Sequence, residues 1–299
     1  SQQNIEEALS GTNPILYPDN DFYSSEFIKS STNNINLFLD ASGGNEKSTY
    51  YVNTSWYHND GWLNIGEKDI TDRLNVRSNI DVDINDFLTM NMGVSGRFLF
   101  GHSPNTNYAS NINSYWQRFS SELPNAYPIL WNPEMISDPS ESDEIINEAQ
   151  LINGMLLGGN SSYLNNLYAD LTMNGVSKQM ERDVQFATGL DFDLGDITEG
   201  LSAKVYGSMS FYNAFTSAQD PSYAVYEPVF DSLEVLTGVV KYGEDKMGNR
   251  YDITGGDFNR RYMWYGTLNY DHSFGKHHIN SVAMRSEERR VGKECATGC

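Results

Sequence analysis

The strongest constraint on the fold is a strict alternation of polar and apolar residues. Between residues 73 and 84 every second side chain is apolar or small, and the side chains between them are polar or charged. Successive side chains of a strand point to opposite faces, so this segment predicts a β-strand with one apolar and one polar face. The predicted strand has about twelve residues, roughly twice the usual length in soluble proteins.

The same alternation recurs along the chain and predicts eight strands. Their ranges are 34–41, 49–58, 73–84, 88–98, 183–194, 201–211, 262–271 and 278–284. Short connections rich in Gly, Asn and Asp, which favour hairpin turns, alternate with longer ones. The longest are an outer loop at about 102–180 and a second at about 219–257. The first exceeds ordinary loop lengths, so we expect it to be functional or to hold its own structure. Its segment 134–157 has the pattern of a helix, with a start at Ser142 and a stop at Gly158.

Long alternating strands with short turns at one end and long loops at the other are typical of outer-membrane β-barrels. Aromatic residues near the strand ends fit the interfacial girdles of such barrels. The predicted fold class is therefore all-β, with about eight strands of a larger antiparallel up-and-down transmembrane β-barrel over residues 1–284. A soluble antiparallel sheet with one wet face would show the same alternation and is the alternative.

Composition narrows the partners. The chain has 20 Lys and Arg against 40 Asp and Glu, a net charge of −20. Phosphate would be repelled, which argues against a nucleic-acid partner. The apolar runs are too short for a membrane-spanning helix. Because the chain begins at Ser1 without a start methionine or a signal segment, we expect a mature protein or a piece of one.

The C-terminal residues 285–299 are predicted to be a non-native tail. Residues 285–295 read R-S-E-E-R-R-V-G-K-E-C, which resembles the in-frame translation of a common sequencing-adapter oligonucleotide. A charged, solvated end is the alternative. The tail holds both cysteines, Cys295 and Cys299, so residues 1–284 contain none.

The sequence shows no catalytic, metal-binding or cofactor-binding pattern, and we predict neither an enzyme nor a cofactor. The acidic run from Asp138 to Glu148 has ligands that suit calcium but lacks the spacing of an EF-hand loop, so a solvated loop is favoured. Charged residues on the polar strand faces are the candidate lumen-facing residues: Arg73, Arg77, Asp81, Asp83 and Arg97. Cross-strand charge pairs without a further role are the alternative.

Aromatic residues of the first outer loop are the candidate ligand contacts. Tyr115, Trp116 and Trp131 have rings that can stack on a sugar or pack on a peptide. Packing of the loop on itself is the equally weighted alternative.

Several stretches resemble the SusC/RagA class of TonB-dependent outer-membrane transporters, over nearly all of residues 15–284. They are Tyr17-Pro-Asp-Asn-Asp-Phe-Tyr23, Ala41 to Tyr51, Asp72 to Asp81, Gly93-Val-Ser-Gly-Arg97 and Tyr127-Pro-Ile-Leu-Trp-Asn-Pro133. The resemblance implies a larger barrel plugged from inside, in the outer membrane of a Gram-negative, Bacteroidetes-like cell. It also implies import of oligosaccharides or peptides with a SusD-like surface lipoprotein and the TonB complex as partners, the latter through parts outside this sequence.

Two other functions remain open. A passive outer-membrane porin would share every strand-level feature, and a plug domain in the full-length protein would separate it from a transporter. A soluble or surface-attached carbohydrate-binding β-protein would instead pack its apolar strand faces against a second layer.

Overall fold

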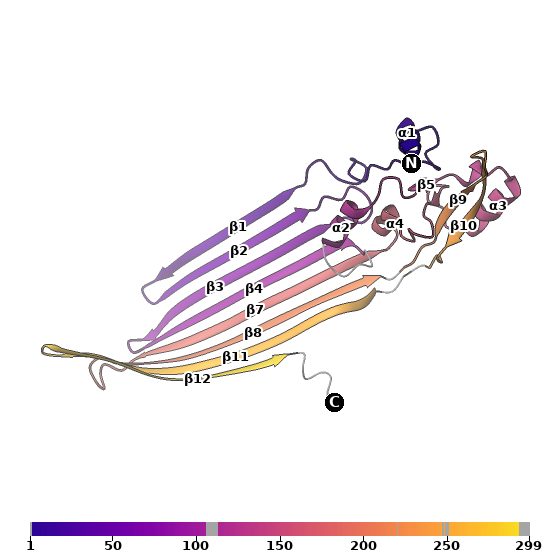
Figure 1. Cartoon of the computed structure of the whole chain (residues 1–299). Coiled ribbons are helices and arrows are strands. Elements are labelled where there is room, and N and C mark those ends of the chain that lie inside the picture. The colour runs from indigo at the N-terminus through magenta and orange to yellow at the C-terminus, as the bar shows by residue number, and fades with distance from the viewer. Residues whose placement is uncertain (1, 106–112, 220, 247, 249–250, 293–299) are drawn as a thin grey trace, which may run out of the picture.

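Eight long antiparallel strands form one continuous sheet in the computed structural model (Figure 1), which describes residues 2–105, 113–219, 221–246, 248 and 251–292. Neighbours in the sheet follow the order β1-β2-β3-β4-β7-β8-β11-β12, so each strand pairs with the next long strand along the chain. The strands are β1 (Asn34–Asn45), β2 (Ser48–Asp60), β3 (Ile70–Asn85), β4 (Leu88–Pro104), β7 (Val176–Asp193), β8 (Leu201–Gln219), β11 (Tyr251–Phe274) and β12 (His277–Gly292).

The pairing register gives the sheet one apolar and one polar face. Directly paired residues lie on the same face of a sheet, so a row of partners can be followed from strand to strand. One such row on the apolar face is Ala41, Val52, Ser78, Val94, Phe186, Met209 and Tyr262. A neighbouring row on the polar face is Asp40, Asn53, Arg77, Ser95, Gln185, Ser210 and Arg261.

Connections at the two ends of the sheet differ in length, as the sequence predicts. At one end β1 and β2 are joined by Glu46 and Lys47 alone, where the Asn45 side chain accepts hydrogen bonds from the backbone N–H groups of Lys47 and Ser48, both 2.9 Å long. The β3–β4, β7–β8 and β11–β12 connections lie at the same end. At the opposite end the connections are residues 61–69, 105–175 and 220–250.

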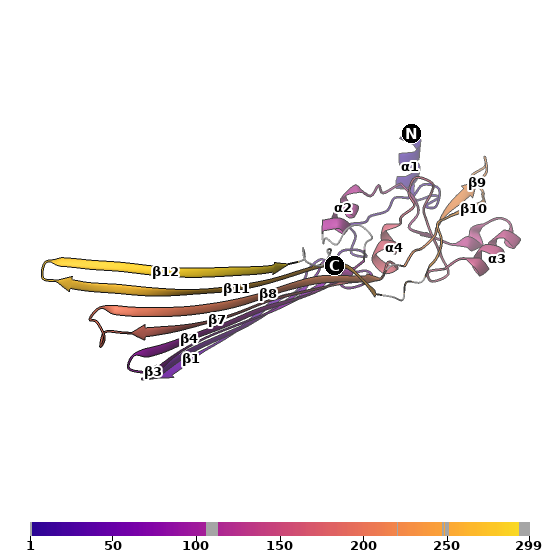
Figure 2. The same cartoon turned by 90° about the horizontal axis from the view of Figure 1, so that it is seen from below.

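The sheet itself has almost no buried core. Among the described residues, the buried hydrophobic side chains that belong to its eight strands are Val176 and Ala218, both at strand ends. Large apolar side chains on its apolar face are open, such as Leu39 at 71% exposed and Val205 at 52%. Figure 2 shows why: the sheet is a single curved layer with nothing packed along most of its length.

The core lies instead in the loop cap, which comprises the described residues within 2–33, 61–69, 105–175 and 220–250. Its elements are α1 (Gln2–Ser10), α2 (Asn113–Ser121), β5 (Leu130–Trp131), η1 (Pro133–Met135), α3 (Pro139–Glu148), β6 (Leu156–Leu157), α4 (Leu167–Thr172), β9 (Val225–Phe230) and β10 (Leu236–Tyr242). β5 pairs with β6, and β9 with β10. Figures 1 and 2 both place these elements at the end of the sheet where the long connections lie.

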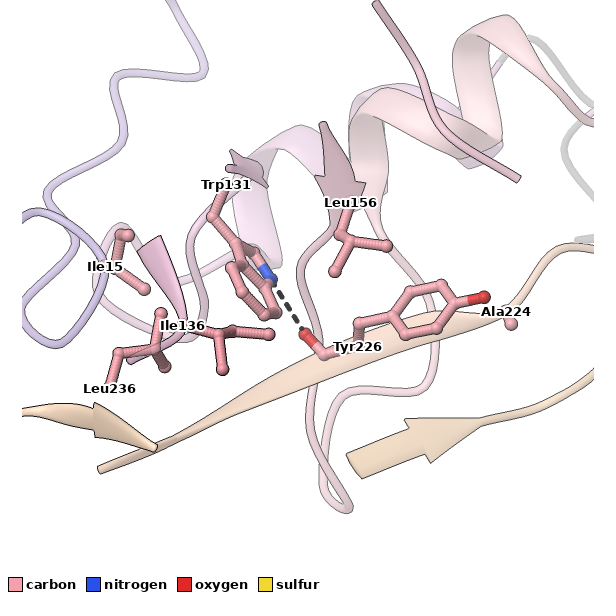
Figure 3. Close-up of a cluster of buried hydrophobic side chains, with 7 residues drawn as sticks. All are labelled: Ile15, Trp131, Ile136, Leu156, Ala224, Tyr226 and Leu236. Carbon is pink, nitrogen blue, oxygen red and sulfur yellow. Dashed lines mark hydrogen bonds between the residues drawn. The ribbon is translucent and has the colours of Figure 1, made fainter. Parts of the chain in front are cut away.

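Two hydrophobic clusters hold the loop cap together. The first joins the N-terminal segment to both long loops through Ile15, Trp131, Ile136, Leu156, Ala224, Tyr226 and Leu236 (Figure 3). The second consists of Phe22, Phe27, Leu63, Phe119, Leu167 and Leu171. The N-terminal segment contributes to both clusters, so four segments far apart in sequence fold as one unit.

The structure corrects several predicted boundaries. The two outer loops, predicted at about 102–180 and about 219–257, correspond to the connections 105–175 and 220–250, which are bounded by the ends of β4, β7, β8 and β11. The helix predicted within 134–157 is α3, which starts at Pro139 and ends at Glu148. Its N-cap is Asp138, whose carboxylate accepts from the Ser140 N–H at 2.9 Å, with proline at the first helical position. No described helix is long and apolar enough to cross a membrane.

Candidate functional site

The polar face of the sheet carries the candidate lumen-facing residues. Arg73, Arg77, Asp81 and Asp83 alternate along β3 and share one face, and Arg97 on β4 joins them because it pairs with Asn75 of that face. The structure therefore brings the five predicted residues onto one surface. That this surface faces a lumen remains a prediction.

Most of these residues contact a neighbouring strand. The Arg73 guanidinium lies 5.0 Å from the centre of the Tyr57 ring, and Arg97 Nη2 lies 3.8 Å from a carboxylate oxygen of Glu181. Asp83 accepts a hydrogen bond of 2.7 Å from the Thr89 hydroxyl, and Asp81 one of 3.1 Å from Asn91 Nδ2. Of these contacts, Arg97 with Glu181 is a cross-strand charge pair of the kind the alternative expects, whereas the others are a ring contact and two hydrogen bonds. They fix a half-exposed polar surface that solvent or a solute can reach.

A second candidate region lies in the loop cap, where a buried charge network connects its segments. Arg118 Nη2 of α2 lies 3.3 Å from Glu122 Oε2 and 3.2 Å from Asp170 Oδ2 of α4. The Tyr223 hydroxyl donates to Asp170 Oδ1 at 2.6 Å, and Asn174 Nδ2 donates to the same oxygen at 2.9 Å. The network thus joins the first outer loop to the second.

Asn166 extends this network at the start of α4. Its side-chain oxygen caps the helix by accepting from the Tyr168 N–H at 2.9 Å, while its Nδ2 donates to the carbonyls of Ile129 and Gly158, both at 2.9 Å. Asn166 is fully buried, with 0% exposure. Every polar group of its amide is therefore satisfied, which makes the residue a structural junction rather than a free ligand contact.

Burial sets the charge states in this network. Burial raises the pKa of the Asp170 carboxyl above its ordinary value, against the opposing effects of the Tyr223 hydrogen bond and the Arg118 charge. Burial would lower the pKa of Arg118, but Asp170 and Glu122 outweigh it and raise that pKa. Burial and the neighbouring Asp170 raise the pKa of Tyr223 far above its usual value, so its hydroxyl stays a donor at physiological pH.

The predicted aromatic ligand contacts differ in their surroundings. Trp131 is 2% exposed and its indole N–H donates to the Tyr226 carbonyl at 3.1 Å, as Figure 3 shows, so here it packs within the loop cap, and ligand contact by this residue stays a prediction. Its apolar ring fills the first cluster. Trp116 is half-buried against Phe119 of the second cluster, with ring centres 5.7 Å apart. Tyr115 belongs to α2, and its side chain lies outside the described residues. Ligand contact by Trp116 and Tyr115 stays a prediction.

A surface groove of about 180 Å³ lies between the N-terminal segment, the first outer loop and β9. Its lining combines apolar groups such as Ile15 and Phe230 with polar ones such as Asn160 and Glu227. Glu227 also accepts a hydrogen bond of 2.8 Å from Tyr242, which fixes its carboxylate. The groove has room for a small polar group, and its lining residues all belong to the loop cap.

The acidic run folds into α3 and its N-cap rather than into a loop. Within the described part of the chain, no group of three or more His, Cys, Asp or Glu side chains is placed to hold a metal ion. The residues that build the charge network, Arg118, Asp170 and Asn166, carry no sequence signal that distinguishes them from other polar loop residues. Only the contact across the loops reveals them.

Together these features define the class of fold: part of the wall of an antiparallel up-and-down transmembrane β-barrel with elaborate loops at one end. Neither a family model nor a curated protein matches the chain. Among solved structures, the RagAB peptide transporter matches with a TM-score of 0.52 and 14% identity, over 93% of this chain and 26% of its own. The RagAB peptide importer in the 'closed-closed' state matches with a TM-score of 0.53 and 14% identity, over 96% of this chain and 29% of its own.

The chain therefore spans less than a third of the transporter chains whose fold it shares. The fold-class prediction is confirmed, and so is the resemblance to RagA-type barrels at the level of the fold. An open sheet with β1 and β12 at its edges is what a section of a larger barrel wall looks like.

Proposed function

We propose that this chain is part of the barrel of a SusC/RagA-type outer-membrane transporter that imports oligosaccharides or peptides. In this proposal the apolar face of the sheet contacts lipid, the polar face lines the lumen or contacts a plug, and the loop cap faces the cell exterior. A SusD-like lipoprotein covers the loop cap, and the TonB complex supplies energy through parts outside this sequence. The cell is Gram-negative and Bacteroidetes-like.

The observation that carries the proposal is the size of the uncovered apolar face. Apolar runs of about nine residues over the seven strands from β1 to β11 make a surface of roughly 30 Å by 30 Å, on the order of 900 Å². Soluble monomers rarely expose apolar patches above a few hundred Å². The soluble alternative needs a second layer over this face, and no described segment lies there. A lipid bilayer covers such a face without further protein.

The pairing of β12 with β11 supports the prediction that residues 285–299 are a non-native tail. The tail residues Arg285, Glu287 and Arg289 pair opposite Gly266, Trp264 and Tyr262, on the apolar face. Charged side chains on a lipid-facing surface are destabilising. We therefore propose that the native strand departs from this sequence after residue 284.

Spin labels on adjacent residues test the membrane assignment. A single cysteine for the label is introduced into the full-length protein at Leu268 of the apolar face or at Thr267 of the polar face. Cys295 and Cys299, if present, are replaced by serine, and the labelled protein is reconstituted in vesicles. We expect the label at Leu268 to collide with dissolved oxygen and the label at Thr267 with a water-soluble nickel complex. Equal access of the nickel complex to both labels would refute the membrane assignment.

Uptake by cells tests transport and separates the porin alternative. Cells lacking the full-length gene are compared with cells lacking TonB function for uptake of labelled oligopeptides and oligosaccharides. A transporter predicts that both deletions abolish uptake of the same substrate. A porin predicts that uptake survives the loss of TonB.

A further inference from the structure

Two arginines, one on β7 and one on β11, lie on the apolar face near the loop end of the sheet. Arg182 of β7 pairs with Phe98 and Asn213, and Arg260 of β11 pairs with Phe211, all on the apolar face. Both side chains are exposed. Charged residues on this face are unexpected for a wall that contacts lipid. Their position along the strand determines whether they lie within the hydrocarbon region or at its boundary.

Each arginine lies just beyond the loop end of an apolar stretch that is long enough to cross the hydrocarbon region. The stretches are residues 184–192 on β7 and 262–270 on β11, each about nine residues, and a tilted barrel strand crosses the hydrocarbon core in about nine to eleven. The arginines therefore lie at the outer boundary of the bilayer. The penalty for arginine on a lipid face falls to about 0–1 kcal/mol at that level.

In the part of the chain that the structure describes, neither arginine has an acidic partner, although the chain has 40 Asp and Glu. Among the described residues, the recorded contacts of Arg182 are a hydrogen bond to Met180 Sδ, and those of Arg260 are the rings of Phe211 and Phe258, 5.6 Å and 4.6 Å from the guanidinium carbon. The polar-face cation Arg97, by contrast, lies near Glu181, and Lys204 pairs with Asp191. The guanidinium groups of Arg182 and Arg260 can therefore bind a partner outside the chain.

The two guanidinium groups are spaced to share an anionic headgroup. β8 separates their strands, and two residues along the strand separate their rows, which gives a Cα separation of roughly 12 Å. Two arginine side chains can close that distance around one or two phosphates. Arginine forms bidentate hydrogen bonds to phosphate, and Phe211 and Phe258 hold the Arg260 guanidinium at the surface.

We propose that Arg182 and Arg260 bind the phosphate groups of a phosphorylated glycolipid in the outer leaflet. This inference rests on the proposed function, because it needs the apolar face in lipid and the loop cap outside. The acyl chains of the lipid lie along the apolar face below, and the phosphates meet the arginines at the headgroup level. Basic residues at the boundary of a membrane wall recognise anionic headgroups in this way.

A lipid titration tests the proposal. The full-length protein is placed in phosphatidylcholine nanodiscs with increasing amounts of bis-phosphorylated lipid A, and bound lipid A is counted by native mass spectrometry. Two Arg–phosphate contacts at about 1 kcal/mol each predict that the double variant Arg182→Ala/Arg260→Ala binds about 30-fold more weakly. The variant Arg182→Lys/Arg260→Lys keeps the charges and should retain most of the binding.

The matched control removes two lysines at the opposite end of the strands, Lys47→Ala/Lys276→Ala, and should bind lipid A like the unmodified protein. Lipid A without phosphates should bind weakly to every variant, and salt should weaken binding to the unmodified protein. The proposal would be overturned if the unmodified protein bound lipid A with and without phosphates equally. It would also be overturned if Arg182→Ala/Arg260→Ala bound phosphorylated lipid A as tightly as the unmodified protein. A spin label at Leu268 in the same nanodiscs reports insertion: an inserted protein without phosphate preference refutes the lipid site alone, whereas failure to insert refutes the proposed function as well.

Discussion

Replacing Val205 with arginine distinguishes a lipid-facing wall from a water-exposed one. Val205 lies near the middle of the apolar run of β8, opposite Leu190 and Gly266, and is 52% exposed. In water, arginine at so open a position changes the free energy of unfolding by no more than about 0.5 kcal/mol. In the middle of a bilayer it costs about 2–4 kcal/mol, a factor of roughly 30 to 1,000 in the folding equilibrium.

The assay is urea titration of the full-length protein folded into lipid vesicles. The matched control is Ser208→Arg, which adds the same side chain to the polar face of the same strand, opposite Ala187 and Met263. We expect Val205→Arg to lower the free energy of unfolding by at least about 2 kcal/mol and Ser208→Arg to leave it nearly unchanged. Equal effects of the two variants would show that the faces share one solvent, and the assignment of lipid to the apolar face would be wrong.

Three further predictions concern the loop cap. Trp131→Ala removes a ring that is 2% exposed and should lower cap stability by about 3–5 kcal/mol, seen as faster proteolysis of the outer loops while the strands stay protected. In Gly158→Ala the added Cβ would overlap the Pro128 carbonyl oxygen, so the loop must shift and the melting temperature of the cap should fall. Gly207→Ala, with open space around the new methyl, should leave that temperature unchanged. The raised pKa of Asp170 means that the folded cap binds its proton more readily than the unfolded chain does, so this group's contribution to stability is complete at low pH and is lost as the pH rises through the raised pKa. Tryptophan-fluorescence melting should show this loss, and Asp170→Asn should flatten the profile; a profile that is the same with asparagine would contradict it.

Much of the sheet could be predicted from residue order alone. The alternation from Arg73 to Ile84 falls within β3, and all eight predicted strands are present in the predicted order. Period-two patterning is local, because each side chain's face depends only on its position in the strand. Strand ends are less predictable. β11 begins at Tyr251 rather than at Tyr262, because the strand continues through Asp257 and Phe258, where polar and apolar residues do not alternate clearly.

The loop cap could not be predicted in the same way. Trp131 and Trp116 look alike in sequence as exposed aromatic loop residues, yet Trp131 is buried by Tyr226, a residue of the second loop. Arg118 and Asp170 are ordinary polar residues until α2 and α4 bring them to 3.2 Å. Such contacts join residues about 50 to 100 positions apart, and no local pattern encodes which of the many possible pairs forms.

The sequence by itself determined the strands, their two faces and the alternation of short and long connections, because these depend on the period of the side chains and on turn chemistry. Tertiary structure alone decided where the core lies: in the loop cap, with the sheet left as a single layer. It also decided which residues surround Arg182 and Arg260, and among the described residues none of these neighbours is an acidic partner. Neighbours across the sheet follow from the register of four strands rather than from the residues beside each arginine in sequence.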